Sequence, residues 1–125
     1  MNFLIIDDSP LLTRVLVTYL KSLGHSCGAI LDSTETEGWL SQNPCDAVIL
    51  DIVMPKIDGV ALIPIIREKY PAMPIVIFTG LGFDEEMMEL TRVAGANGYV
   101  SKGLGASDIY RALMQVLKAS NSNRS

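Results

Sequence analysis

Four short apolar runs, each followed at once by polar residues, set the strongest constraint on how this chain can fold. The runs span residues 3–6, 47–50, 75–78 and 98–100. Short, predominantly apolar runs indicate strands that are buried on both faces, as in a parallel sheet covered by helices. Because parallel strands end at one common edge, the residues that follow these runs are expected to lie together. That edge is where open α/β sheets bind ligands.

The polar residues that follow the runs include both acids and a base. Asp7 and Asp8 follow the first run, Asp51 the second and Thr79 the third, and Lys102 lies just beyond the last. Two carboxylates about 5 Å apart repel each other by about 3 kcal/mol at an effective dielectric constant near 20, so this acidic group needs a cation. Mg²⁺ prefers oxygen ligands and retains waters, and the Lys102 ammonium can bridge to a carboxylate. The sequence therefore predicts a site for a magnesium ion beside a lysine.

A fifth strand and five helices complete the pattern. Residues 26–31 are expected to form the further strand, and a helix is expected after each strand. Two helix starts have specific signals: Ser9-Pro10, with serine as the cap, and the segment 34–37, which matches a capping box. Strand and helix thus alternate five times, which predicts an α/β fold with a five-stranded parallel sheet, doubly wound by helices on both faces.

Length and composition limit the classes of protein that remain. The 125 residues fit one domain, and 49% apolar with 19% charged residues indicates a soluble globular chain. The net charge of −4 argues against nucleic-acid binding, and no apolar run approaches the about 20 residues of a membrane span. The N-terminus lacks a signal peptide's basic segment, so a cytoplasmic location is expected. We expect one domain over residues 1–119, followed at 120–125 by a polar tail that is either a natural end or the start of a linker.

Histidine and cysteine chemistry is nearly excluded by number. His25 is the only histidine, which rules out a His-based triad or a multi-histidine metal site, and its glycine-flanked turn predicts a solvated loop residue. Cys27 and Cys45 have no motif spacing. Both are expected to be reduced, Cys27 within a strand and Cys45 just before one.

The assembled pattern resembles the receiver domain of two-component response regulators, of the chemotaxis-receiver type. The order Asp7-Asp8, Asp51, Thr79, Lys102 is similar to that family's site, and residues 51–59 are close to its D-x-x-M-P-x-x-D-G segment. The resemblance covers residues 1 to about 119. It implies a flavodoxin-like fold with strand order 2-1-3-4-5.

The resemblance implies a phosphoacceptor and a metal site. Asp51 would take a phosphoryl group from a phosphohistidine on a histidine kinase or a histidine phosphotransfer domain. Asp8, Asp51 and the Val53 backbone carbonyl would ligate Mg²⁺, and Asp7 would act through a metal-bound water. Such a transfer needs positioning and charge neutralisation more than covalent help from the protein.

The resemblance also implies a signalling switch. Lys102 would pair with Asp51 and then with the phosphoryl group, and Thr79 would donate its hydroxyl to a phosphoryl oxygen. Tyr99 would be the ring that swings inward when Thr79 moves. The added charge of about −1.5 to −2 would then shift the surface formed by the fourth helix, fifth strand and fifth helix, which controls a downstream protein or a fused output domain.

The sequence departs from the family pattern at three positions. Gly103 replaces the proline that usually follows the lysine, which predicts a more flexible loop. Val53 and Leu81 stand two residues after Asp51 and Thr79, and both are apolar. Neither can hydrogen-bond a water that attacks an aspartyl phosphate, so we expect slow self-hydrolysis.

Three other functions compete with the receiver interpretation. An aspartyl-nucleophile phosphatase of the common type needs D-x-D, which Asp51-Ile52-Val53 lacks. A flavin-binding module needs a phosphate loop without the two aspartates after the first strand. A receiver that only docks, without phosphorylation, is disfavoured by the intact acidic set. Met87, Met88 and Leu90 on the fourth helix leave two interpretations: an exposed partner-binding patch, or core plus scattered surface residues.

Overall fold

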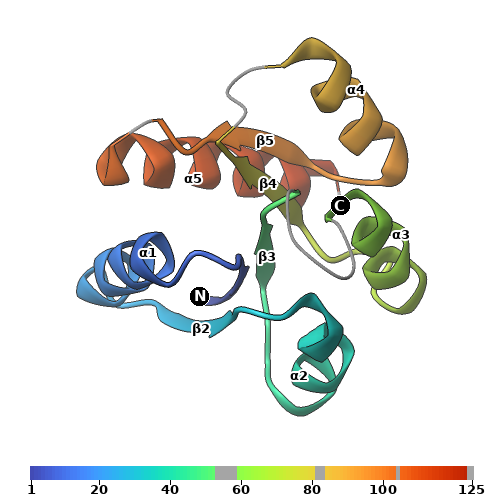
Figure 1. Ribbon diagram of the computed structural model, residues 1–125. Coiled ribbons are helices and arrows are strands. Elements are labelled where there is room, and N and C mark those ends of the chain that lie inside the picture. The colour runs from blue at the N-terminus through green and yellow to red at the C-terminus, as the bar shows by residue number, and fades with distance from the viewer. Residues whose placement is uncertain (53–58, 81–83, 104, 124–125) are drawn as a thin grey trace.

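The computed structural model describes residues 1–52, 59–80, 84–103 and 105–123, with side chains described as far as residue 119. Five strands form one parallel sheet in the order β2-β1-β3-β4-β5, as Figure 1 shows. The strands are β1 (Asn2–Ile6), β2 (Ser26–Ile30), β3 (Ala47–Leu50), β4 (Ile75–Thr79) and β5 (Gly98–Ser101). The predicted strand order and the doubly wound α/β fold are confirmed.

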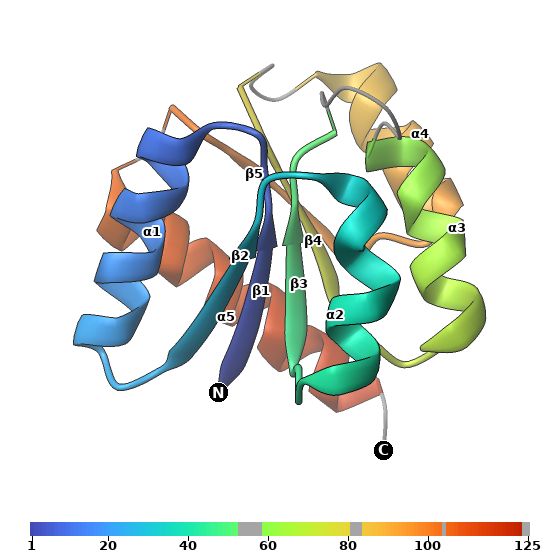
Figure 2. The ribbon, with the colours of Figure 1, turned by 60° about the horizontal axis from the view of Figure 1, so that its bottom comes forward.

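Helices cover both faces of this sheet. They are α1 (Pro10–Ser22), α2 (Thr36–Gln42) after the short 3-10 helix η1 (Ser33–Glu35), α3 (Gly59–Lys69), α4 (Glu85–Ala94) and α5 (Ala106–Asn123). In Figure 2, α1 and α5 lie on one side of the strands, and α2, α3 and α4 on the other. In the described part of the chain, none of the helices combines the length and the hydropathy that a bilayer crossing requires.

Alternate residues of the strands supply two separate cores. Leu4 and Ile6 pack with α2 and α3, whereas Phe3 and Ile5 face α1 and α5. The whole of β3 is buried, as expected for a strand at the centre of a parallel sheet. Because both faces of the central strands are covered, their polar chemistry is expected at the strand ends.

Two predicted helix caps are wrong in detail. Ser9 stands at the N-cap of α1, but its side chain makes no capping hydrogen bond; instead its N–H donates to Asp7 Oδ1 at 3.0 Å. Thr34 does not open a capping box, because Asp32 caps the preceding η1 turn. The Asp32 carboxylate accepts from the Thr34 N–H at 3.0 Å and from the Thr34 hydroxyl at 2.7 Å. At Thr34 the Asp32 carboxylate thus takes the place of the predicted cap.

His25 lies outside the helices and strands and is partly exposed, as predicted, but its ring has specific partners that the sequence does not indicate. The terminal amine of Met1 donates to His25 Nδ1 at 3.1 Å, and His25 Nε2 lies 2.9 Å from the hydroxyl of Tyr110 on α5. The ring also makes an edge contact with Phe3 at 5.2 Å between centroids. His25 therefore joins the start of the chain to its last helix, a contact that spans 85 residues of sequence.

The two cysteines are free, as predicted, and they lie in β2 and just before β3. Burial raises the pKa of both Cys27 and Cys45 to about 11, which keeps the thiols protonated at neutral pH. At the other end of the chain, α5 continues to Asn123. The helix thus extends into the segment 120–125, which the sequence predicts as a polar tail.

Candidate functional site

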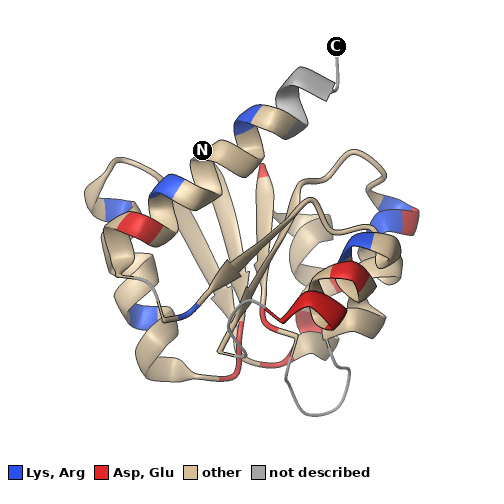
Figure 3. Ribbon diagram, turned by 90° about the horizontal axis from the view of Figure 1, so that it is seen from above, with Lys and Arg blue, Asp and Glu red and all other residues tan. Residues whose placement is uncertain are grey.

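Three carboxylates meet at the C-terminal edge of the sheet. Asp7, Asp8 and Asp51 each offer an oxygen, and these oxygens all lie within 4.8 Å of one another. Asp7 is 1% exposed and Asp51 5%, whereas Asp8 faces solvent. Figure 3 shows the acidic segments gathered at this end of the strands. With Lys102 these residues form what we term the acidic pocket.

The pairing of β1 with β3 places Asp7 and Asp51 at the same height in the sheet. Ile6 of β1 pairs with Leu50 of β3, so the residues that follow them emerge at the same height. The Asp51 N–H donates to the Ile6 carbonyl at 2.9 Å, and the Asp7 N–H donates to the Ile30 carbonyl at 3.1 Å. The backbone of both acids is thus still part of the sheet, which fixes where their carboxylates start.

Lys102 reaches both buried carboxylates. Its Nζ lies 2.8 Å from Asp7 Oδ2 and 3.1 Å from Asp51 Oδ2, and its side chain is 15% exposed. Burial by itself would lower the pKa of Lys102, but hydrogen bonding and attraction from Asp7 and Asp51 outweigh it and raise the pKa. The lysine therefore stays charged. The Nζ also lies 5.5 Å from the centre of the Phe78 ring.

Sequence reasoning missed the closer of these two ion pairs. Asp7 was expected to act on a metal through water, yet its carboxylate lies nearer to Lys102 than the carboxylate of Asp51 does. The signal was available, since Asp7 follows β1 directly and β1 pairs with β3. The turn after the lysine is also held in place, because the Gly103 N–H donates to Ser101 Oγ at 3.1 Å. A proline at that position would have no such donor.

Thr79 ends β4 next to the acidic pocket, and Tyr99 lies on the neighbouring strand β5, in register with Ile77. Thr79 is fully buried and accepts the Lys102 N–H at 2.8 Å with its backbone carbonyl. Tyr99 is half-buried against the core on the α3 side. Burial raises the pKa of Tyr99, and the nearby backbone of Asp84 opposes that rise. The Tyr99 hydroxyl therefore lies near Asp84, the N-cap residue of α4.

Gly59 permits a close approach behind Asp51. It is the first residue of α3, and a Cβ at this position would overlap the carbonyl oxygen of Asp51 and the Cα of Ile52. Its N–H donates to the Ile52 carbonyl at 3.2 Å. The start of α3 therefore abuts the backbone of the predicted phosphoacceptor. Val53, whose carbonyl is a predicted metal ligand, and Leu81 lie outside the described residues.

The donor set of the acidic pocket fits a hard divalent cation. Three carboxylates face one lysine, so negative charge remains after Lys102 is counted, and two of the acids are almost completely buried. Buried carboxylates in excess of their partners favour the binding of further positive charge. Oxygen-only donors select Mg²⁺ or a similar ion over softer metals.

Comparison with known proteins identifies the family. The sequence model described as the response regulator receiver domain matches residues 3–114. The chain belongs to the family of response regulator receiver domains of two-component systems.

The curated relatives are longer proteins. The chain is 34% identical over 104 residues, or 82% of its length, to an NtrX-like response regulator from Rickettsia felis, of which it spans 22%. It is 30% identical over 122 residues to the virulence transcriptional regulatory protein PhoP from Salmonella typhimurium, covering 98% of this chain and 54% of that one. The chain thus corresponds to a part of each relative.

Solved structures repeat the fold over nearly all of the chain. NtrX from Brucella abortus superposes with a TM-score of 0.90 at 22% identity, covering 98% of this chain and 28% of that one. A CheY-like receiver domain protein from Methanospirillum hungatei gives a TM-score of 0.87 at 20% identity, covering 98% and 97%. At these identities the likeness shows the fold.

Proposed function

We propose that this chain is a phosphorylation-dependent signalling switch in which Asp51 accepts a phosphoryl group from a phosphohistidine. The donor would be a histidine kinase or a histidine phosphotransfer domain. The observation that carries the proposal is the buried Asp51 carboxylate, whose Oδ2 lies 3.1 Å from Lys102 Nζ within a cluster of two further acids. Membership of the receiver family supports it.

The chemistry asks for charge control more than for covalent catalysis. An Asp51 oxygen attacks the phosphorus while the bond to the donor's imidazole nitrogen breaks, and that nitrogen keeps the electron pair. Lys102, already charged beside Asp51, neutralises a phosphoryl oxygen as the group arrives. Asp8 and Asp51, with the Val53 carbonyl and with Asp7 through water, would hold Mg²⁺, which when bound supplies further charge neutralisation.

The switch would run from Asp51 through β4 and β5. A phosphoryl group adds acceptor oxygens for the Thr79 hydroxyl at the end of β4. Movement of Thr79 and of the Lys102 backbone bonded to it would change the room available to Tyr99. Because Tyr99 lies near the Asp84 cap, the change would reach the α4–β5–α5 surface that a downstream protein or a fused output domain engages.

We also propose which residues form the switching unit and where the protein acts. The unit that switches would be residues 1–119, and the chain would act in the cytoplasm without direct contact with nucleic acid or membrane. Its own phosphorylation and slow dephosphorylation would be its only reactions, so it would not be an enzyme acting on a separate substrate. An output such as transcription would lie in a fused domain or in another protein.

Intact mass measurement tests the phosphoacceptor. The protein is incubated with Mg²⁺ and acetyl phosphate, and we expect a gain of one phosphoryl group that Asp51→Asn abolishes. Asp108→Asn, an exposed acid on α5, is the matched control and should gain the group as the unsubstituted protein does. A gain that survives Asp51→Asn would contradict the proposal. Continuous release of phosphate from many phosphoesters would favour a phosphatase instead.

The lifetime of the phosphorylated form gives a second test. Val53 and Leu81 cannot orient an attacking water, so we expect slow decay in the unsubstituted protein. Val53→Asn and Leu81→Glu should each speed the loss of the phosphoryl group, by about tenfold if the new side chain orients water. Decay is followed by intact mass after removal of acetyl phosphate. Unchanged decay in both variants would contradict this explanation of the lifetime.

A further inference from the structure

Strand β2 forms an edge of the sheet with backbone groups directed away from it. Among the described strands, β2 pairs with β1 alone. The Ser26 N–H donates to the Met1 carbonyl at 2.9 Å, so Ser26 directs its backbone toward β1. Successive residues of a parallel strand direct their N–H and carbonyl groups to opposite sides, so those of Cys27 and Ala29 are directed outward. The outer side of β2 therefore offers both donors and acceptors to another strand.

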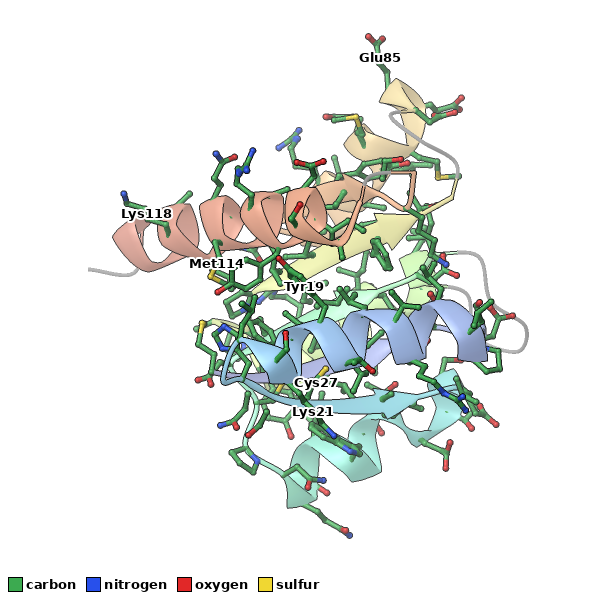
Figure 4. The ribbon with its side chains drawn as sticks, turned by 90° about the vertical axis from the view of Figure 1, so that its left-hand side faces the viewer. Tyr19, Lys21, Cys27, Glu85, Met114 and Lys118 are labelled. Carbon is green, nitrogen blue, oxygen red and sulfur yellow. The ribbon has the colours of Figure 1, made fainter. Side chains whose placement is uncertain are left out.

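The edge of β2 lacks the features that commonly prevent such pairing. Residues 26–29 are all small, and β2 contains neither a charged residue nor a proline. At Gly28 even a Cβ would overlap the ring of Trp39 on α2, which accounts for the glycine. In Figure 4, β2 faces the viewer between α1 and α2, and neither helix crosses in front of it. An open, uncharged edge strand is a template for a strand of another chain.

Two hollows flank the ring of Trp39 along β2, and their charges differ in sign. The hollow beside the first half of the strand has a volume of about 640 Å³ and is lined by Lys21. The hollow beside the second half has a volume of about 680 Å³ and is lined by Glu35. Both of these side chains are exposed. The edge therefore has a positive charge beside its start and a negative charge beside its end.

We propose that residues 26–31, which we term the β2 edge, pair with the same edge of a second copy of this chain in an antiparallel dimer. With the two-fold axis at Ala29, the outward groups of Cys27 would meet those of Leu31 in the second copy, and each edge would satisfy the other. Leu31 is 48% exposed and would be covered by this contact.

The placement of charge favours a second copy over other occupants. Antiparallel pairing brings the start of each β2 edge beside the end of the other, so each Lys21 would face Glu35 of the second copy. A parallel pair would instead place like charges together. An extended segment of a different protein would gain the same backbone hydrogen bonds, but the two charges complement the edge itself.

The dimer goes beyond the proposed function and does not depend on phosphorylation. It would join the sheets of two copies into one continuous sheet. Because β5 lies at the opposite edge of the sheet from β2, the α4–β5–α5 surface would remain uncovered in the dimer. The two copies could therefore each present that surface to an output.

Sedimentation of the full chain over a range of concentrations tests the pairing. We expect a reversible equilibrium between monomer and dimer. Ala29→Pro removes an outward N–H that the pairing with β1 does not use, and it should weaken the dimer at least about tenfold. Ala29→Ser is the matched control, because it keeps the N–H, and it should change the dissociation constant less than about threefold. Circular dichroism establishes that each variant is folded.

Exchange of the two charges tests the antiparallel arrangement. Lys21→Glu and Glu35→Lys should each weaken the dimer about fivefold, because each places like charges together twice. The double variant restores opposite charges and should return to within about twofold of the unsubstituted chain. Lys69→Glu is the control, since Lys69 is also an exposed lysine in the last turn of its helix, and it should leave dimerisation unchanged.

Three results would overturn the proposal. A chain that stays monomeric up to millimolar concentration would contradict it and leave an extended segment of another protein as the occupant of the β2 edge. A dimer that tolerates both Ala29→Pro and the single charge changes would use a different face. A double variant that dimerises no better than the single variants would contradict the antiparallel arrangement. If Ala29→Pro does not fold, the exposed charge variants decide alone.

Discussion

The two ends of the β4–β5 pair are held together by different forces. At the C-terminal ends, the acidic pocket combines three carboxylates with one ammonium, so its stability depends on net charge. At the N-terminal ends, one guanidinium binds neutral backbone carbonyls. An end that is held by an imperfect charge balance responds to an added charge, whereas an end held by hydrogen bonds to neutral groups does not.

Arg67 organises the unresponsive end. Its guanidinium donates at 2.7–3.3 Å to the backbone carbonyls of Tyr70, Pro71, Met73 and Gly95. It also donates to Asn97 Oδ1 at 3.1 Å, and the same oxygen accepts the Ile75 N–H at 2.8 Å. We term Arg67 with these acceptors the arginine clamp. It fixes the turn before β4 and the turn between α4 and β5.

Helix α4 therefore has one end that is fixed and one end that can shift. The arginine clamp holds Gly95, which ends α4 at a φ of 121°, a conformation that favours glycine. The other end of α4 is capped by Asp84, which lies near Tyr99. A charge added at Asp51 should therefore move the first turns of α4 about a fixed last turn.

The largest expected effect comes from breaking the clamp. Arg67→Ala removes five hydrogen bonds and leaves partly buried carbonyls without their donor, so we expect a loss of about 3 kcal/mol in the free energy of unfolding. Urea denaturation measures the loss. Arg92→Ala is the control, because among the described residues that guanidinium pairs with exposed Glu89, and it should cost less than about 0.5 kcal/mol. Equal losses in the two variants would contradict the role of the clamp.

A smaller effect of opposite sign is expected at the acidic pocket. Asp51→Asn removes one of the three repelling carboxylates and leaves the Asp7–Lys102 pair intact, so without Mg²⁺ it should stabilise the fold by about 1 kcal/mol. Mg²⁺ should stabilise the unsubstituted protein and have less effect on the variant. Thermal unfolding with and without Mg²⁺ checks both statements. A destabilised Asp51→Asn variant would contradict the view that charge repulsion governs this end.

The smallest expected effect concerns pH and His25. Burial and the terminal amine lower the pKa of His25 below its usual 6.5, so its contribution to stability is complete above about pH 6.5 and is lost as the pH falls through the lowered pKa. Between about pH 7.5 and 5.5, His25→Asn should lose less stability than the unsubstituted protein, by less than about 1 kcal/mol. Denaturation midpoints at the two pH values measure the difference. The same pH dependence in both proteins would show that His25 does not contribute.

Sequence patterns predicted the parts of the molecule that depend on short segments. The apolar runs located the strands because a wholly buried strand tolerates few polar residues, and Asp7, Asp51 and Lys102 were found because they follow those runs. Alternation of strands and helices then gave the parallel sheet. The strand order came from the resemblance to the receiver family, and the register of β1 against β3 places the acids side by side.

Contacts between distant residues were not predicted. Arg67 binds backbone carbonyls, which every residue possesses, so no side-chain pattern marks its acceptors. The contact of His25 with Tyr110 joins residues 85 positions apart and depends on how α5 crosses the sheet. The capping error at Thr34 has a local cause, because Asp32 competes for the same turn.

Hydrogen exchange of the phosphorylated and unphosphorylated protein tests the central claim most directly. The account predicts that phosphorylation of Asp51 changes amide protection at the end of β4, in the first turns of α4 and around Lys102. Protection around Arg67 and Asn97 should stay the same. A change that is uniform over both ends of β4 and β5, or one confined to the arginine clamp, would contradict the division of this molecule into a responsive and an unresponsive end.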